Sequence, residues 1–215
     1  MYTISGSGCR QVLCSWIKTI VGCVTDAYAD YVHYDSFTDT NGVTIPNHTP
    51  EKAVGAYAEI SGTFDIQSNT CSRLTSLGYP NIQLAAGADF DATWVVNQRA
   101  ATCSNGPLFR CGGADHPWDA GGWYCECLTG VPIRLANNNG GWGVKYTGTN
   151  GPTAGGVDTV RILAVGNAIT VWLNGVQEIN VSDAYANTSA YIGWLINHDQ
   201  ETTAPYSTLD SLIAV

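Results

Sequence analysis

The sequence predicts an all-β protein built as a sandwich of two antiparallel sheets. Charged residues make up only 13% of the 215 residues, against a usual share of about 25%, and glycine occurs 24 times. From residue 35 onward, short runs of alternating apolar and polar residues begin or end at Gly, Asn or Pro, which is typical of strands joined by turns. No helical pattern separates these runs, and this favours antiparallel pairing between neighbouring strands.

The clearest element is a hairpin in residues 169–181, ITVWLNGVQEINV. Asn174-Gly175 lies between two runs of β-branched and aromatic residues, and this dipeptide readily adopts the positive φ angles of a type I′ turn. Because side chains alternate along a strand, the first strand of the hairpin has two different faces. The two sets are Ile169, Val171 and Leu173 on one face, and Thr170 and Trp172 on the other.

The remaining strands are expected from the same alternation and from the turn residues that flank them. The expected strands are 57–60, 63–67, 81–85, 90–96, 107–111, 123–128, 133–136, 143–146, 157–165, 168–173, 176–181, 190–196 and 207–215. Two segments, 112–122 and 135–143, are so rich in glycine and asparagine that we expect loops. No internal repeat and no linker divides 35–215, so we expect one domain there.

The N-terminal segment 1–34 differs from the rest. Apolar residues recur at helical spacing within it and form one stripe: Val12, Leu13, Trp16, Ile17, Ile20, Val21 and Val24. The stripe predicts either a short helix lying on the sandwich or an arm that docks on a neighbouring molecule. The segment does not resemble a secretory signal, because no basic residue precedes Arg10 and Lys18 interrupts the apolar run. Either the chain is made in the cytosol with Met1 retained, or a leader was removed.

The charge and hydropathy exclude two classes of partner. The formal net charge is −9, and an acidic surface repels phosphate backbones, so we expect no nucleic-acid ligand. The apolar run near the N-terminus is too short and too polar to cross a bilayer.

The eight cysteines do not follow the spacing of a small disulfide scaffold. Cys125 and Cys127 share a face of a predicted strand, but a zinc site needs two further ligands, and Cys111 and His116 are the local candidates. The alternatives are buried free thiols or one or two bridges, such as Cys103 to Cys111.

Several segments together resemble a known fold family. They are Tyr34-Asp35-Ser36-Phe37 with Asp39-Thr40-Asn41-Gly42, then Gly106-Pro107-Leu108-Phe109-Arg110 with the strand 123–128, then Val160-Arg161-Ile162, Tyr191-Ile192-Gly193 and the closing run 209–215. Their order and spacing resemble concanavalin-A-like, laminin-G-type jelly-roll modules over residues 35–215. The resemblance implies a jelly-roll sandwich whose last strand pairs near the first. The family includes lectins, endo-glucanases and non-catalytic modules of secreted and viral proteins, so the fold alone does not define the function.

The sequence lacks the carboxylate arrangement of a glycosidase. The glucanase branch of the family places Glu-x-Asp-x-(x)-Glu on one strand, and none of the five glutamates here has Asp two residues on. Glu126 shares its strand face with Tyr124 and Leu128 rather than with acids. The four histidines are scattered singly, and we assign them no role. We therefore expect no enzymatic activity.

Aromatic and amide residues in the loops predict a glycan-binding platform, because sugar rings stack on indoles while amides and carboxylates bind hydroxyls. The candidate contacts are Trp118, Asp115, Asp119, Asn138 and Trp142. The alternative is that Trp123 and Trp142 are core residues at strand starts. The family resemblance also makes calcium plausible, with Asp35 and Asp210 brought together by pairing of the first and last strands.

We expect a non-enzymatic subunit of an extracellular assembly, in particular of a bacteriophage virion, as a capsid decoration or cement protein or as a tail or fibre component. The expected partners are other virion proteins and further copies of this chain in a homo-oligomer, with glycan contact through the loops. Three features favour a virion subunit: Met1 without a leader, the apolar N-terminal stripe and the missing catalytic acids. The alternatives are a stand-alone carbohydrate-binding, lectin-like module and a divergent endo-glycosidase.

Overall fold

The computed structural model describes residues 33–53, 57–73, 81–98, 104–112, 121–196 and 207–215. The apolar stripe predicted between Val12 and Val24 lies outside these residues. Within them, every regular element is a β-strand except one 3₁₀ turn, η1 (Ile45–Asn47). This confirms the predicted all-β class.

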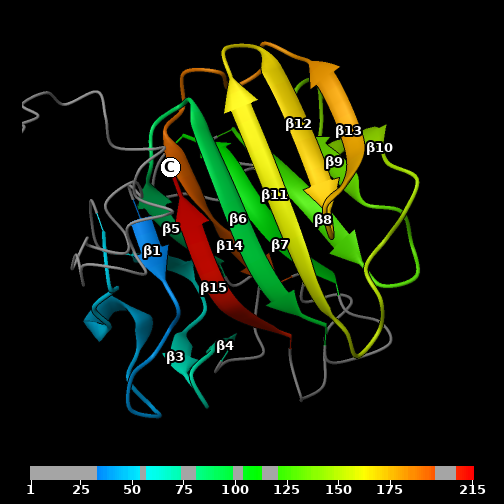
Figure 1. The fold of residues 1–215 in the computed structure, drawn as a ribbon. Helices are drawn as coiled ribbons and strands as arrows, with labels where there is room; N and C mark the ends of the chain where they lie inside the picture. Colours follow the sequence, from blue (N-terminus) through cyan, green and yellow to red (C-terminus); the bar gives the residue numbers. More distant parts are fainter. Residues whose placement is uncertain (1–32, 54–56, 74–80, 99–103, 113–120, 197–206) are drawn as a thin grey trace, which may run out of the picture. The chain divides into compact units, whose positions relative to one another are not determined.

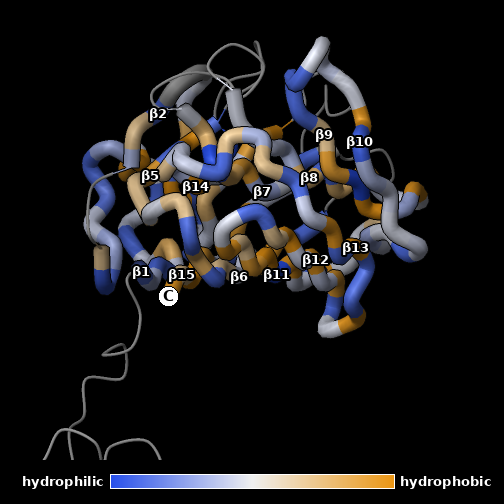
Figure 2. Tube along the Cα trace, turned by 90° about the horizontal axis from the view of Figure 1, so that it is seen from above, coloured by the Kyte–Doolittle hydropathy of each residue, from blue (hydrophilic) through white to orange (hydrophobic). Residues whose placement is uncertain are grey.

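The strands form two antiparallel sheets that pack face to face (Figures 1 and 2). The first, sheet A, runs in the spatial order β13 (Val176–Ser182), β12 (Ala168–Leu173), β11 (Val157–Val165), β6 (Phe90–Asn97), β15 (Thr208–Ala214), β4 (Cys71–Arg73) and β3 (Phe64–Ile66), with β1 (His33–Asp35) also paired to β15. The second, sheet B, runs in the order β10 (Gly143–Thr147), β9 (Arg134–Asn137), β8 (Trp123–Leu128), β7 (Ser104–Cys111), β14 (Tyr191–Ile196), β5 (Asn81–Ala85) and β2 (Ala58–Ser61).

The chain crosses between the two sheets several times, as a jelly roll does. β5 in sheet B is followed by β6 in sheet A and then by β7 in sheet B, and β14 in sheet B is followed by β15 in sheet A. The last strand pairs with the first, with Asp35 opposite Leu212. The pairing of the terminal strands, implied by the family resemblance, is therefore confirmed.

Each of the predicted strands overlaps an observed strand. Two observed strands, β1 and β4, were not predicted, because three residues are too few to show an alternating pattern. β1 also places the start of the sandwich at His33, before the expected boundary at residue 35. The predicted loop 135–143 is too long, because β9 continues to Asn137 and β10 begins at Gly143.

The hairpin forms as predicted. Asn174 and Gly175 have φ angles of 51° and 81°, as a type I′ turn requires. Along β12 the side chains of Ile169, Val171 and Leu173 are buried, whereas those of Thr170 and Trp172 are partly exposed.

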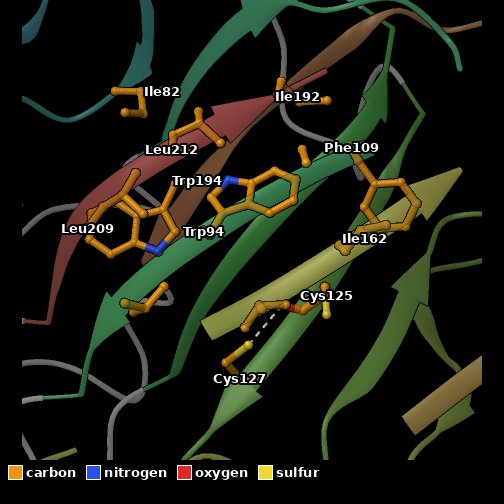
Figure 3. Packing of buried hydrophobic residues seen from close by; sticks show 14 of the residues in the cluster. Ile82, Trp94, Phe109, Cys125, Cys127, Ile162, Ile192, Trp194, Leu209 and Leu212 are labelled. Carbon is orange, nitrogen blue, oxygen red and sulfur yellow. Dashed lines mark hydrogen bonds between the residues drawn. The ribbon is translucent and has the colours of Figure 1, made fainter. Parts of the chain in front are cut away.

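The core lies between the sheets, where hydrophobic residues gather in Figure 2. Trp94 from β6 and Trp194 from β14 are both fully buried there (Figure 3). The indole Nε1 of Trp94 donates a hydrogen bond to the carbonyl oxygen of Gly193 at 2.9 Å, which joins sheet A to sheet B across the core. No helix in the described part of the chain has the length and hydropathy needed to span a membrane.

Candidate glycan-binding site

The strand register brings two of the predicted loops to one end of sheet B. Asn137 at the end of β9 pairs with Trp123 at the start of β8 and with Gly143 at the start of β10. The turn 138–142 therefore leaves the sheet beside Trp123. The predicted loop 112–122 ends immediately before Trp123, so both segments emerge at the same end of neighbouring strands.

The turn 138–142 is held in shape by its neighbours. The Asn137 side-chain oxygen accepts a hydrogen bond from the backbone N–H of Asn139 at 3.0 Å. The Lys145 Nζ donates to the carbonyl oxygens of Asn139 at 3.0 Å and of Gly141 at 3.3 Å. Gly140 and Gly141 have φ angles of 76° and 110°, which let the chain reverse within so few residues. The turn therefore presents its side chains from a defined backbone.

The sequence did not decide whether Trp123 and Trp142 are core residues or ligand contacts, and the structure gives them different environments. Trp123 is a core residue with no exposed surface, and its Nε1 donates to the Tyr185 carbonyl oxygen at 3.0 Å. Its ring stacks between Phe109 and Tyr146, with centroids 6.1 Å from each. Trp142, by contrast, is 43% exposed. Trp142 is thus the described tryptophan of this pair that offers an indole surface to a ligand.

Asn138 and Trp142 both lie in the turn 138–142, and their part in glycan binding stays a prediction. Asn138 is partly exposed, and Asn139 beside it is exposed. Trp118, Asp115 and Asp119 lie outside the described residues, and their part in the site stays a prediction. Lys145, which carries a positive charge into the turn, was not predicted; its signal in the sequence is its place three residues after Trp142 in Trp-Gly-Val-Lys.

A second polar pair lies on the outer face of the same strands. Glu126 of β8 is opposite Arg134 of β9, and Arg134 Nη2 contacts Glu126 Oε2 at 2.5 Å. Their side chains are 13% and 27% exposed, respectively. Because Cys125 and Cys127 point into the core, Glu126 points outward with Tyr124 and Leu128, as the alternation predicted.

The centre of the outer face of sheet B is closed to solvent. Leu108, Cys111, Tyr124 and Leu195 form a second buried cluster on this side of the sheet. Their exposed fractions do not exceed 4%. The accessible described groups of sheet B that suit a ligand include those of the turn 138–142, the pair Glu126 and Arg134, and Tyr191 on β14.

The predicted calcium ligands have other partners. Asp35 Oδ1 accepts hydrogen bonds from the backbone N–H of Phe37 at 2.7 Å and from His48 Nε2 at 2.9 Å. Asp210 Oδ1 accepts from the Thr208 hydroxyl at 3.0 Å. In the described ranges no three His, Cys, Asp or Glu side chains are grouped as metal ligands. The calcium site stays a prediction without a completed ligand set.

Two of the histidines, to which the sequence assigned no role, make buried structural contacts. His33 and His48 are buried, with exposed fractions of 0% and 7%. His33 Nε2 is 2.8 Å from the Tyr57 hydroxyl, while the two ring nitrogens of His48 face Asp35 and Asp39 at 2.9 and 3.2 Å. These contacts fix η1 and the chain before it to β1. His116 and His198 lie outside the described residues.

The four described cysteines, Cys71, Cys111, Cys125 and Cys127, are buried free thiols. Of the alternatives, the free-thiol interpretation holds for these four, and Cys111 is not bridged. Burial raises the pKa of the Cys111 thiol to about 12, so it stays protonated and unreactive near neutral pH. The thiol of Cys127 donates to the carbonyl oxygen of Cys125 at 3.6 Å (Figure 3). A side-chain hydrogen bond with the Cys125 thiol, together with burial, raises the pKa of Cys127 well above the usual value.

No protein-family model matches this sequence, and no curated protein matches it. Solved structures do resemble the fold. A structure from work on endo-acting O-glycanases of human gut microbiota has a TM-score of 0.58 at 8% identity, covering 86% of this chain and 98% of that chain. A protein of unknown function with a galectin-like fold from Bacillus subtilis has a TM-score of 0.56 at 10% identity, covering 84% and 97% of the two chains.

The carbohydrate-binding module CBM66 from Bacillus subtilis is also similar, with a TM-score of 0.51 at 11% identity over 74% of this chain and 91% of that chain. At these identities the likeness concerns the fold alone. The chain is a two-sheet jelly-roll sandwich similar to galectin-like proteins and carbohydrate-binding modules.

Proposed function

We propose that this chain is a carbohydrate-binding module that contacts glycans through the turn 138–142. The observation that carries the proposal is the indole of Trp142, which is 43% exposed on a turn fixed by Asn137 and Lys145. The fold, shared with galectin-like proteins and a carbohydrate-binding module, supports this function over an unrelated one.

The chemistry of the turn suits a sugar ring. An exposed indole offers an apolar surface to the C–H face of a pyranose. Asn138 and Asn139 supply amide donors and acceptors for hydroxyl groups. Lys145 adds a cation beside the turn, which favours a glycan bearing a carboxylate or sulfate over a neutral one. Because the turn is already ordered, binding loses little backbone entropy.

We propose that the module binds without cleaving its ligand. Hydrolysis of a glycosidic bond requires two carboxyl groups, about 5 to 10 Å apart, on either side of that bond. The Glu126 carboxylate instead contacts Arg134 at 2.5 Å. A similar fold occurs in a structure from work on endo-acting O-glycanases, so this part of the proposal has a test of its own. Incubation with the bound glycan should release no reducing sugar.

The virion role predicted from the sequence stays a prediction. It rests on Met1 and on the apolar stripe of the N-terminal segment, which lies outside the described residues. No described contact, and none of the three similar structures named above, favours it over a free-standing module.

The direct test is a glycan array followed by titration calorimetry of the best ligand. Trp142→Ala should weaken binding at least tenfold, because it removes the stacking surface, whereas Trp142→Tyr should retain part of the affinity. Val176→Ala is a matched control, since Val176 is 55% exposed on β13 of the other sheet and pairs with the inward-facing Leu173. Unchanged affinity of folded Trp142→Ala contradicts the proposed site.

A further inference from the structure

The outer face of sheet A combines apolar and neutral polar side chains in an otherwise acidic protein. Cross-strand neighbours on it include Ile213, Thr93, Arg161 and Trp172, which follow one another across β15, β6, β11 and β12. A parallel row contains Asp91, Leu163, Thr170 and Asn180. These strands lie side by side in Figure 1. Apolar residues on the outer face of an antiparallel sheet are unusual when that face meets only water.

The centre of this face is rigid. Arg161 donates from Nε to Asp91 Oδ1 at 2.8 Å and from Nη2 to Asp91 Oδ2 at 2.5 Å. The same guanidinium lies over the ring of Trp172, 4.8 Å from its centroid. The Arg161 side chain is nevertheless 46% exposed. Arginine and tryptophan dominate the binding energy of protein interfaces, and two fixed partners lower the entropy that Arg161 would lose on association.

Charge favours a second copy of this chain as the occupant. The protein carries a formal net charge of −9, so two copies repel one another over most orientations. On the outer face of β6, β11, β12 and β13 the described charges are Asp91 and Arg161, which cancel, and Asp210 on β15 adds one negative charge. A two-fold axis near this pair would place each Arg161 beside the Asp91 of the other copy, so the face is complementary to itself.

The size of the face also suits a dimer. Five strands at about 4.8 Å spacing, and the length of β11 at about 3.3 Å per residue, give a face of roughly 24 by 30 Å, or about 700 Å². A standard specific interface buries about 800 Å² per partner.

We propose that the chain forms a two-fold dimer through the outer face of sheet A, centred on Asp91, Arg161 and Trp172. Trp142 belongs to sheet B, so the dimer leaves the turn 138–142 of both copies accessible. Two such sites would bind a multivalent glycan surface with an avidity above the affinity of one site. The dimer itself does not depend on glycan binding, so its test is independent of the function proposed above.

The experiment is sedimentation equilibrium of the full chain without glycan, at concentrations up to about 100 µM, since interfaces of this size bind with micromolar or tighter affinity. The expected mass is twice the 22.8 kDa of one chain. Trp172→Ala should weaken the dimer at least tenfold. Val144→Ala, 46% exposed on β10, is the matched control and should leave the dimer unchanged.

Charge-reversal variants of Asp91 and Arg161 give a more stringent test of the dimer. Asp91→Arg makes the face basic and Arg161→Asp makes it acidic, so each variant alone should be monomeric. An equimolar mixture should recover the dimer, which a folding defect in either variant would not allow. Circular dichroism confirms that each variant is folded.

A wild-type monomer over the whole range overturns the proposal, as does a dimer that survives both single charge variants. If Trp172→Ala leaves the mass unchanged but abolishes glycan binding, the face binds sugar rather than a second copy, and the proposal is wrong.

Discussion

At the residue scale, the hydrogen bond of Trp94 to Gly193 is a buried polar contact between the two sheets. Replacing Trp94 with Phe removes the donor and leaves the Gly193 carbonyl without it inside the core. A buried hydrogen bond of this kind contributes about 1 kcal/mol, and leaving one partner unpaired costs more than the bond itself. We expect Trp94→Phe to lower the free energy of unfolding, as measured by denaturant titration.

Trp194→Phe is the matched control. Trp194 is equally buried, and its Nε1 has no hydrogen-bond partner in the part of the chain that the structure describes. Both substitutions remove the same ring volume, so their difference isolates the hydrogen bond. Trp94→Phe should cost about 1 kcal/mol more than Trp194→Phe. Equal losses in the free energy of unfolding would show that the Trp94 hydrogen bond makes no net contribution to stability.

His48 makes stability depend on pH. Burial by itself lowers the pKa of His48, but hydrogen bonds and charges from Asp35 and Asp39 outweigh it and raise the pKa above the usual 6.5. The folded state therefore binds the proton more tightly than the unfolded state. The stabilisation is complete below pH 6.5 and is lost as the pH rises through the folded pKa.

His33 makes stability depend on pH in the opposite direction and over a lower pH range. Burial lowers its pKa to about 4, so its contribution declines as the pH falls from 6.5 towards 4. Unfolding is therefore measured above pH 6.5, where His33 no longer contributes, and comparison with His48→Gln separates His48 from the buried thiols, whose raised pKa also lowers stability above about pH 8. The wild type should lose stability with rising pH, and His48→Gln should show a flatter profile. Parallel profiles would mean that His48 is not protonated in the folded protein.

At the residue scale, the burial of a side chain and its distant partners could not be predicted from the local sequence. Trp123 and Trp142 both follow glycine-rich segments, and their local sequences do not tell a core residue from an exposed one. The register of β8, β9 and β10 makes the distinction, because Trp123 lies in phase with Cys125 and Cys127 on the inner face. His48 was missed for a similar reason, since Asp35 is 13 residues away in sequence.

At the element scale, the packing of β14 against β5 depends on Gly193, because β5 approaches this residue closely. A Cβ added to Gly193 would lie 1.9 Å from the Ile82 carbonyl oxygen of β5. Gly193→Ala should therefore push β5 away from β14 and lower the free energy of unfolding by about 2 to 3 kcal/mol. The measurement is chemical denaturation followed by tryptophan fluorescence.

Gly143→Ala is the control for a strand glycine with open space. No atom lies within 4 Å of a Cβ added there, and Gly143 begins the edge strand β10. Its stability should stay within about 0.5 kcal/mol of wild type. If the two substitutions have equal effects, the close approach at Gly193 is not what constrains β14.

Strands of five or more residues were largely predictable, because alternation over that length defines both the strand and its buried face. β11, with its alternation from Val157 to Val165, shows this most clearly. β1 and β4 were not predicted, since each has three residues and pairs with β15 far away in sequence, although β4 also pairs with the neighbouring β3. β1 is held by β15, about 180 positions later, and no local pattern encodes that contact.

At the scale of the whole molecule, the two sheets offer surfaces of different chemistry. The outer centre of sheet B is closed, and the turn 138–142 and the Glu126–Arg134 pair are polar groups at its margin, while sheet A presents a broad face centred on Asp91, Arg161 and Trp172. The sequence predicted Asn138 and Trp142 as neighbours because they share a turn. It did not predict the face around Arg161, since Asp91, Arg161 and Trp172 come from three separate strands.

The most direct test of the proposed function is to map a bound glycan by NMR on the folded protein. We predict that titration shifts the indole N–H signal of Trp142 and the amide signals of Asn138, Asn139 and Lys145. The indole signals of the buried Trp94 and Trp123 should stay in place and serve as internal controls. Shifts that leave the turn 138–142 unaffected and fall on other residues would contradict the proposed site.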